Sequence, residues 1–231
     1  MLQGSISSNK CEDEASIRHH IAVMKEETAK VAADMDLIRD RMKRTFKTRQ
    51  DLILRETGVR TVIEEFPAVT LPGMLLQDAK LAFGKDFLED MRTKMKTFEV
   101  STLLFLKGKN SPLDFQELIE EDPEKVALFN LPLIFNEKRQ LLFTTEEVRI
   151  LTPVIQVEEK KHHIFLDGVR IVSGISTTVE AVSTLLAAYY VFDVKYPTGI
   201  AHTMGFLGHH FCSLGENMPI PVKRFESFLA V

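Results

Sequence analysis

The chain has 231 residues, a formal net charge of −4 and 45% hydrophobic residues, as expected for one large or two small globular domains. The slightly negative charge excludes a global positive field that would attract nucleic acid or anionic lipid. The two cysteines, Cys11 and Cys212, cannot form a disulfide scaffold, and the N-terminus lacks the apolar run of a signal peptide. We therefore expect a soluble intracellular protein, cytoplasmic or nuclear, without a membrane-spanning segment.

Residues 1–13 are small and polar, and we expect them to be disordered. Residues 14–56 contain no glycine or proline. Apolar residues recur there at alternating spacings of three and four, which is the heptad pattern of a coiled coil. This pattern predicts one amphipathic helix roughly 65 Å long. Its predicted interaction face consists of Ile17, Ile21, Met24, Val31, Met35, Ile38 and Met42.

Two interpretations of this helix remain open. In the first, it is a coiled coil that forms a homodimer or docks a protein partner. In the second, it is a long helix, whole or broken, that folds back onto its own protein. The heptad positions contain no leucine, three methionines and two threonines (Thr28 and Thr45), which would make a weak dimer core.

A basic run follows within the same segment. Residues 39–55 carry seven Lys or Arg against two Asp. Side chains of this type contact nucleic-acid phosphates, but the run lacks the interleaved aromatic residues and glycines of many such sites, and a solvated helix face is the alternative. The candidate phosphate contacts are Arg41, Lys43, Arg44, Lys47 and Arg49.

The next segment reads as a series of short helices separated by breakers. Gly58, Pro67, the turn at 107–112 and Pro132 mark the interruptions. The predicted helices are 59–66, 73–83, 86–107, 113–121 and 124–129. We expect a helical subdomain at 57–125 and an α+β subdomain at 126–231, which together could make one domain.

The β content is predicted to begin after this helical half. Asp167-Gly168 between two β-rich runs indicates a type I′ hairpin, in which Leu166 faces Val169 and Ile164 faces Ile171. The run 153–158 adds a third strand, giving an antiparallel meander.

A long helix covers this meander in the predicted fold. Thr177 and Glu180 form a capping box that begins it, and Tyr196-Pro197 ends it. A last helix at 200–213 and a docked apolar C-terminus follow. The order of elements, helices first and strands afterwards, predicts an α+β fold.

The histidines and Cys212 are the candidates for chemistry. His202, His209 and Cys212 share one predicted helix, so a zinc site or a Cys/His nucleophile is conceivable there. However, residues at i and i+7 lie about 10 Å apart along a helix, and no compact metal, nucleotide or hydrolase motif occurs. We therefore assign no catalytic residue, no metal ligand and no cofactor.

Five phrases occur in order over roughly residues 38–212, namely MKRTFKTRQDLIL, VIEEFPAV, FNLPLIF, ILTPVIQVEEKKHHIFLDGVRIV and LLAAYYVFDVKYP. Together they resemble a group of proteins described as similar to sterile alpha motif domain-containing protein 3. Gln50 departs from the pattern, where a second arginine is expected. No sterile alpha motif domain is recognisable in the sequence. The resemblance implies an interaction module and carries no catalytic residues.

The sequence thus favours a non-enzymatic module for protein–protein interaction or oligomerisation, acting through residues 14–56. One alternative is a nucleic-acid-associated module that uses residues 39–55. The other is a Cys/His or zinc-dependent enzyme that uses residues 202–212.

Overall fold

The computed structural model describes residues 13–55, 57–108, 122–215 and 218–229. Its helices are α1 (Glu14–Thr28), α2 (Met35–Arg44), α3 (Phe46–Leu54), α4 (Val59–Glu65), α5 (Met74–Phe83), α6 (Phe87–Gly108), α8 (Pro123–Ile134), α9 (Thr178–Val191), α10 (Ala201–Phe206) and α11 (Ile220–Leu229). Two 3-10 turns lie at Pro67–Thr70 and Arg139–Leu141, and a π-helical turn at Leu207–Phe211. The strands are β1 (Phe143–Thr144), β2 (Val154–Glu158), β3 (Lys161–Leu166) and β4 (Val169–Ile175).

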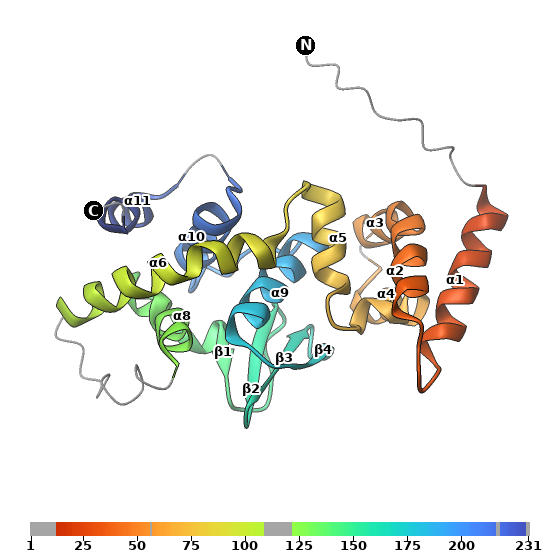
Figure 1. The fold of residues 1–231 in the computed structure, drawn as a ribbon, viewed down its shortest axis with the longest axis horizontal. Coiled ribbons are helices and arrows are strands. Elements are labelled where there is room, and N and C mark those ends of the chain that lie inside the picture. Colours follow the sequence, from red (N-terminus) through yellow and green to blue (C-terminus); the bar gives the residue numbers. More distant parts are fainter. Residues whose placement is uncertain (1–12, 56, 109–121, 216–217, 230–231) are drawn as a thin grey trace, which may run out of the picture.

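These elements form an elongated molecule. Helices α1 to α4 lie at one end, α6, α8, α10 and α11 extend to the other, and α9 lies between them above the sheet (Figure 1). Helices dominate and the strands fall in the C-terminal half, so the predicted α+β class is confirmed. Buried apolar side chains form a cluster that runs from Ile21 to Phe225. The predicted division into 57–125 and 126–231 stays a prediction.

The N-terminal segment consists of three helices, so the predicted continuous helix over residues 14–56 is wrong. Helix α1 ends at Thr28, whose hydroxyl donates to the Met24 carbonyl over 2.7 Å. The Asp34 carboxylate begins α2 by accepting the N–H groups of Asp36 and Leu37, each over 3.0 Å. Helices α1 and α2 then pack side by side as a hairpin (Figure 1). The heptad spacing therefore continues across a turn, and most of its apolar residues pack against the core of the protein.

Helix α9 is the central element of the fold. It is buried on almost every side, and it contacts α5 and α6 as well as the sheet. Thr177 is the N-cap as predicted, because its hydroxyl accepts the Glu180 N–H over 3.2 Å. Among the described residues, the reciprocal bond of a capping box, from the Thr177 N–H to the Glu180 carboxylate, does not form. The helix ends at Val191, earlier than the predicted Tyr196. Asp193 has a left-handed φ of 51°, and the Val194 N–H then donates to the Tyr189 carbonyl over 2.9 Å.

The sheet has the order β1-β2-β3-β4. The predicted meander of β2, β3 and β4 is confirmed, and the short strand β1 adds a parallel pairing with β2. Asp167 and Gly168 both have positive φ, at 53° and 68°, as a type I′ turn requires.

The predicted hairpin register holds only beside the turn. Leu166 pairs with Val169 as expected, but Ile164 pairs with Val172 instead of Ile171. A β-bulge inserts one extra residue into β4 at this point. It lets the adjacent residues Ile171 and Val172 both be buried, which a regular strand with alternating faces would not allow.

Two further helix boundaries differ from prediction. Pro132 does not break its helix, because it lies in the last turn of α8, where the helix continues only to Ile134. The predicted last helix at 200–213 becomes α10 and the π-helical turn, and α11 follows and buries Val222 and Phe225. The predicted disorder at 1–13, turn at 107–112 and helix at 113–121 fall wholly or largely outside the described residues.

Candidate interaction site

An apolar pocket lies where the end of α9 meets α3 and α4. Its volume is about 310 Å³, and its lining residues are Ile53, Leu54, Gly58, Val59, Val62, Phe192, Asp193 and Val194. Leu54 is 67% exposed at this pocket, whereas Val62 and Phe192 are buried in its wall. An open apolar hollow of this size can accept a large side chain of another protein.

Two backbone features shape this pocket. Gly58 joins α3 to α4 with φ 80° and ψ 151°, a conformation that residues with a Cβ rarely adopt. Asp193 carries the left-handed turn that ends α9, and its exposed carboxylate is the one charge in the lining. The side chains that line the pocket are thus apolar apart from the Asp193 carboxylate, while polar atoms still make up nearly half of its exposed surface.

The structure does not leave the predicted interaction face exposed. Ile21, Met24, Ile38 and Met42 are buried in the core that α1 and α2 share with the rest of the chain. Ile17 and Met35 are partly buried against the same core, and only Val31, in the loop after α1, is fully exposed. This placement corresponds to the second sequence interpretation, a broken helix folded onto its own protein.

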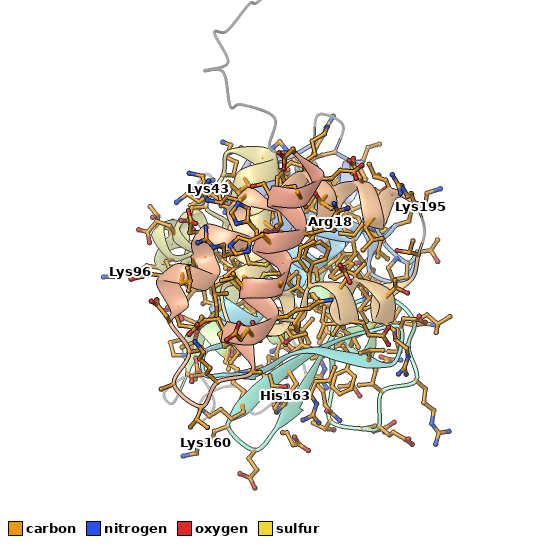
Figure 2. All side chains as sticks on the ribbon, turned by 90° about the vertical axis from the view of Figure 1, so that its right-hand side faces the viewer. Arg18, Lys43, Lys96, Lys160, His163 and Lys195 are labelled. Carbon is orange, nitrogen blue, oxygen red and sulfur yellow. The ribbon has the colours of Figure 1, made fainter. Side chains whose placement is uncertain are left out.

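Most of the candidate phosphate contacts are engaged within the chain. Arg41 and Arg44 each lie 2.9 Å from Asp40, and Arg49 is buried. Lys43 is exposed on α2, at the end of the molecule that α1 and α2 form (Figure 2). Lys47 is also exposed. The basic run therefore does not form one continuous groove of free cations.

Arg49 is instead the centre of a buried polar cluster. Its guanidinium donates to both carboxylate oxygens of Asp78, over 2.9 and 2.6 Å. It also donates to the Thr45 hydroxyl and the Met42 carbonyl, each over 2.8 Å, and lies over the ring of Phe66. The cluster ties α2 and α3 to α5, so Arg49 is a structural residue.

The three candidates for chemistry lie in different surroundings. The backbone N–H groups of His202 and Thr203 donate to the Glu137 carboxylate over 2.8 Å each, and this carboxylate thereby caps the first turn of α10. His209 Nδ1 lies 3.2 Å from the Gly215 carbonyl. Cys212 is fully buried, and burial raises the pKa of its thiol to about 12, so the nucleophilic thiolate is disfavoured.

No group of three or more His, Cys, Asp or Glu residues that could hold a metal ion occurs in the part of the chain that the structure describes. Across the same residues, no helix is both long and apolar enough to cross a membrane.

No local pattern in the sequence indicates the apolar pocket. Its walls come from segments about 140 residues apart, so no local spacing reveals it. Of the two backbone features that shape the pocket, the sequence predicts a helix end at Gly58. It does not predict the turn at Asp193, because the predicted helix continues to Tyr196. Only the folded chain, which places residues 192–194 beside α3 and α4, brings these two residues together.

Comparison with known proteins places the chain beside one family. Residues 10–70 match the family model described as "Sterile alpha motif domain-containing protein 3, helical domain". This match spans α1 to α4, the part of the chain that carries one wall of the pocket. No solved structure matches the chain.

Two curated proteins match the chain at low identity. Sterile alpha motif domain-containing protein 3 of Homo sapiens is 22% identical over 212 residues, which cover 84% of this chain and 41% of that protein. The same protein of Mus musculus is 19% identical over 218 residues, covering 84% and 42%. The chain thus spans about two fifths of the length of these relatives.

The predicted resemblance is confirmed, although the comparisons show no sterile alpha motif domain itself. The match begins at residue 10, so it also includes α1, which lies outside the resemblance predicted over roughly residues 38–212.

Proposed function

We propose that this chain is a protein-interaction module without catalytic activity, which binds a partner protein through the apolar pocket between α3, α4 and the end of α9. The observation that carries the proposal is the pocket itself, with Leu54 exposed on it. Exposed apolar hollows of this kind commonly receive the anchoring side chain of a partner. The relatives, which are named for a domain and not for an enzymatic activity, support the same class.

The lining defines the chemistry of the partner. A large apolar side chain would fill the hollow, and a neighbouring Lys or Arg would pair with the Asp193 carboxylate. The proposal includes an intracellular location, for which the low cysteine content is the support.

Affinity capture from cells with matched variants tests the proposal. Leu54→Glu places a charge at the pocket, and Val31→Glu places the same charge at a fully exposed site on the loop after α1. Neither residue is buried, so both variants are expected to fold. Proteins captured by the parent chain and by Val31→Glu, but lost with Leu54→Glu, support the proposal. An identical set of captured proteins with both variants contradicts it.

A second pair of variants tests the contribution of the Asp193 carboxylate to partner binding. Asp193→Asn and Asp167→Asn each remove one exposed carboxylate at a left-handed position, a conformation that asparagine tolerates well. We expect the first variant to weaken partner binding several-fold, with a smaller dependence on salt, and the second to leave it unchanged.

An interaction module can also bind a second copy of itself, and self-association through residues 14–56 is this alternative to binding a different protein. Light scattering on the full chain tests it directly. A chain that starts at Ile53 would be a poor reagent, because it lacks Arg49 and leaves the buried Asp78 without its partner.

A further inference from the structure

A second pocket lies between α6, the π-helical turn and the end of α11, away from the apolar pocket. Its volume is about 320 Å³, and its lining residues are Lys94, Thr97, Phe98, His210 and Leu229. Phe98 and Leu229 give it an apolar wall, while Lys94, Thr97 and His210 give it polar groups. Its composition therefore differs from that of the apolar pocket, whose one charge is negative.

Lys94 is the cation of this pocket. Its ammonium donates to the carbonyls of His210 and Phe211, over 2.5 and 2.9 Å, at the end of the π-helical turn. Helix ends leave such carbonyls without intrahelical partners, which explains why the ammonium is held there. A lysine ammonium has three N–H donors, so one remains for a ligand. Among the described residues, no carboxylate lies within ion-pair distance of Lys94.

His210 adds a polar but neutral surface. Its ring stacks on Phe206 with centroids 4.9 Å apart. Burial, together with the nearby charge of Lys94, lowers the pKa of His210 to about 4, so the imidazole is uncharged at neutral pH. The nearest carboxylate, Glu226, lies 3.6 Å from Nδ1 and does not line the pocket. The lining thus carries a net positive charge.

We propose that this pocket binds a carboxylate joined to a small apolar group, as at the C-terminus of a polypeptide that ends in a hydrophobic residue. The ammonium of Lys94 and the hydroxyl of Thr97 would hold the carboxylate, while Phe98 and Leu229 would contact the apolar part. The volume is at the low end for small-ligand sites, which suits one side chain and its carboxylate. This proposal does not depend on the proposed function, because it concerns a different pocket with its own probe.

Nuclear magnetic resonance titration with three probes tests the site. The probes are acetyl-Gly-Ser-Val-Leu with a free carboxylate, the same peptide with a C-terminal amide, and 4-methylpentanoate. We expect the free acid to shift the amide signals of Thr97, Phe98 and His210 saturably, and to bind about tenfold or more tightly than the amide. Tighter binding of the peptide acid than of 4-methylpentanoate identifies a polypeptide C-terminus, and equal binding identifies a small carboxylate. Equal binding of acid and amide, or no saturation at millimolar concentration, overturns the proposal.

Matched variants locate the binding. Thr97→Glu places a carboxylate on the same helix face as Lys94, three residues away, and occupies the free donor. Val100→Glu adds the same charge at an exposed position of α6 outside the pocket lining. The first should weaken binding of the free acid about tenfold or more, and the second should not. Lys94→Arg should retain binding, since it keeps the charge. Unchanged affinity in Thr97→Glu overturns the assignment.

Discussion

Arg49 on α3 and Asp78 on α5 form an ion pair with two hydrogen bonds, in which each side chain is only 1% exposed. The pair joins the segment that matches the family's helical domain, residues 10–70, to a helix beyond it. A buried pair of this kind orients the elements that carry it, because each charge needs the other in the absence of water.

Breaking this pair should destabilise the whole chain. Arg49→Met leaves the Asp78 carboxylate buried and unpaired, and we expect a loss of about 3–5 kcal/mol in the free energy of unfolding, measured by urea titration. Arg39→Met, which removes the exposed partner of Asp36, should change it by less than about 1 kcal/mol. The double variant Arg49→Met/Asp78→Leu should lose less than the two single changes together. Additive losses would contradict the coupling.

Stability should decrease in acid through His210. Its pKa in the folded chain is lowered to about 4, so between pH 6.5 and pH 4 the unfolded chain binds more protons than the folded one. The His210 contribution is complete above about pH 6.5 and is lost as the pH falls, by about 2 kcal/mol. Urea midpoints of the parent and of His210→Gln, compared at pH 7 and pH 4.5, measure this difference.

Between pH 7 and pH 4.5, His210→Gln should lose less free energy of unfolding than the parent chain, whatever its stability at pH 7. Burial also lowers the pKa of His162, so part of the acid sensitivity remains in both chains. The same pH dependence in parent and variant would show that His210 is not responsible.

Replacing either of two glycines by alanine should change the stability of the chain, but in opposite directions. Gly58 has φ 80°, and a Cβ there would meet no atom within 4 Å, so Gly58→Ala tests the backbone conformation alone. We expect a loss of about 1–2 kcal/mol. Gly205 lies inside α10, with equally open space and no left-handed φ, and Gly205→Ala should stabilise by about 0.5–1 kcal/mol. Thermal unfolding of both variants checks the pair.

The hairpin of α1 and α2 can be measured directly as a distance. Arg18 lies on α1 and Lys43 on α2, two helices that pack side by side at one end of the molecule (Figure 1). Spin labels at these positions, in a chain with Cys11→Ser and the buried Cys212 retained, should lie within about 20 Å, because the axes of packed helices are only about 10 Å apart. A continuous helix would separate the two positions by about 38 Å. Electron–electron double resonance distinguishes the two, and the longer distance would contradict the fold.

The sequence predicted the elements whose signals are local. Asp167-Gly168 identified its turn because only a few residues tolerate two positive φ angles in succession. Thr177 identified the start of α9 through its side-chain cap. Such features depend on a few neighbouring residues, and tertiary packing does not override them.

The rest depended on contacts between distant segments. Nothing in residues 29–34 breaks a helix, since Gly and Pro are absent, and Asp34 becomes a cap only because α1 and α2 pack together. In the sequence, Arg49 does not differ from its basic neighbours. Only the fold, which places the buried Asp78 carboxylate against it, distinguishes it from them. The bulge at Ile171 and the apolar pocket likewise follow from packing, which periodicity does not encode.

Site-directed photocrosslinking tests the proposed interaction most directly. A photoreactive phenylalanine analogue at Leu54, beside the apolar pocket, is compared in cells with the same analogue at Val31, and each is repeated with Val59→Glu. The proposal predicts covalent partner products from position 54 that disappear with Val59→Glu, and none specific to position 31. Absence of products from position 54, or the same products from both positions, would contradict it.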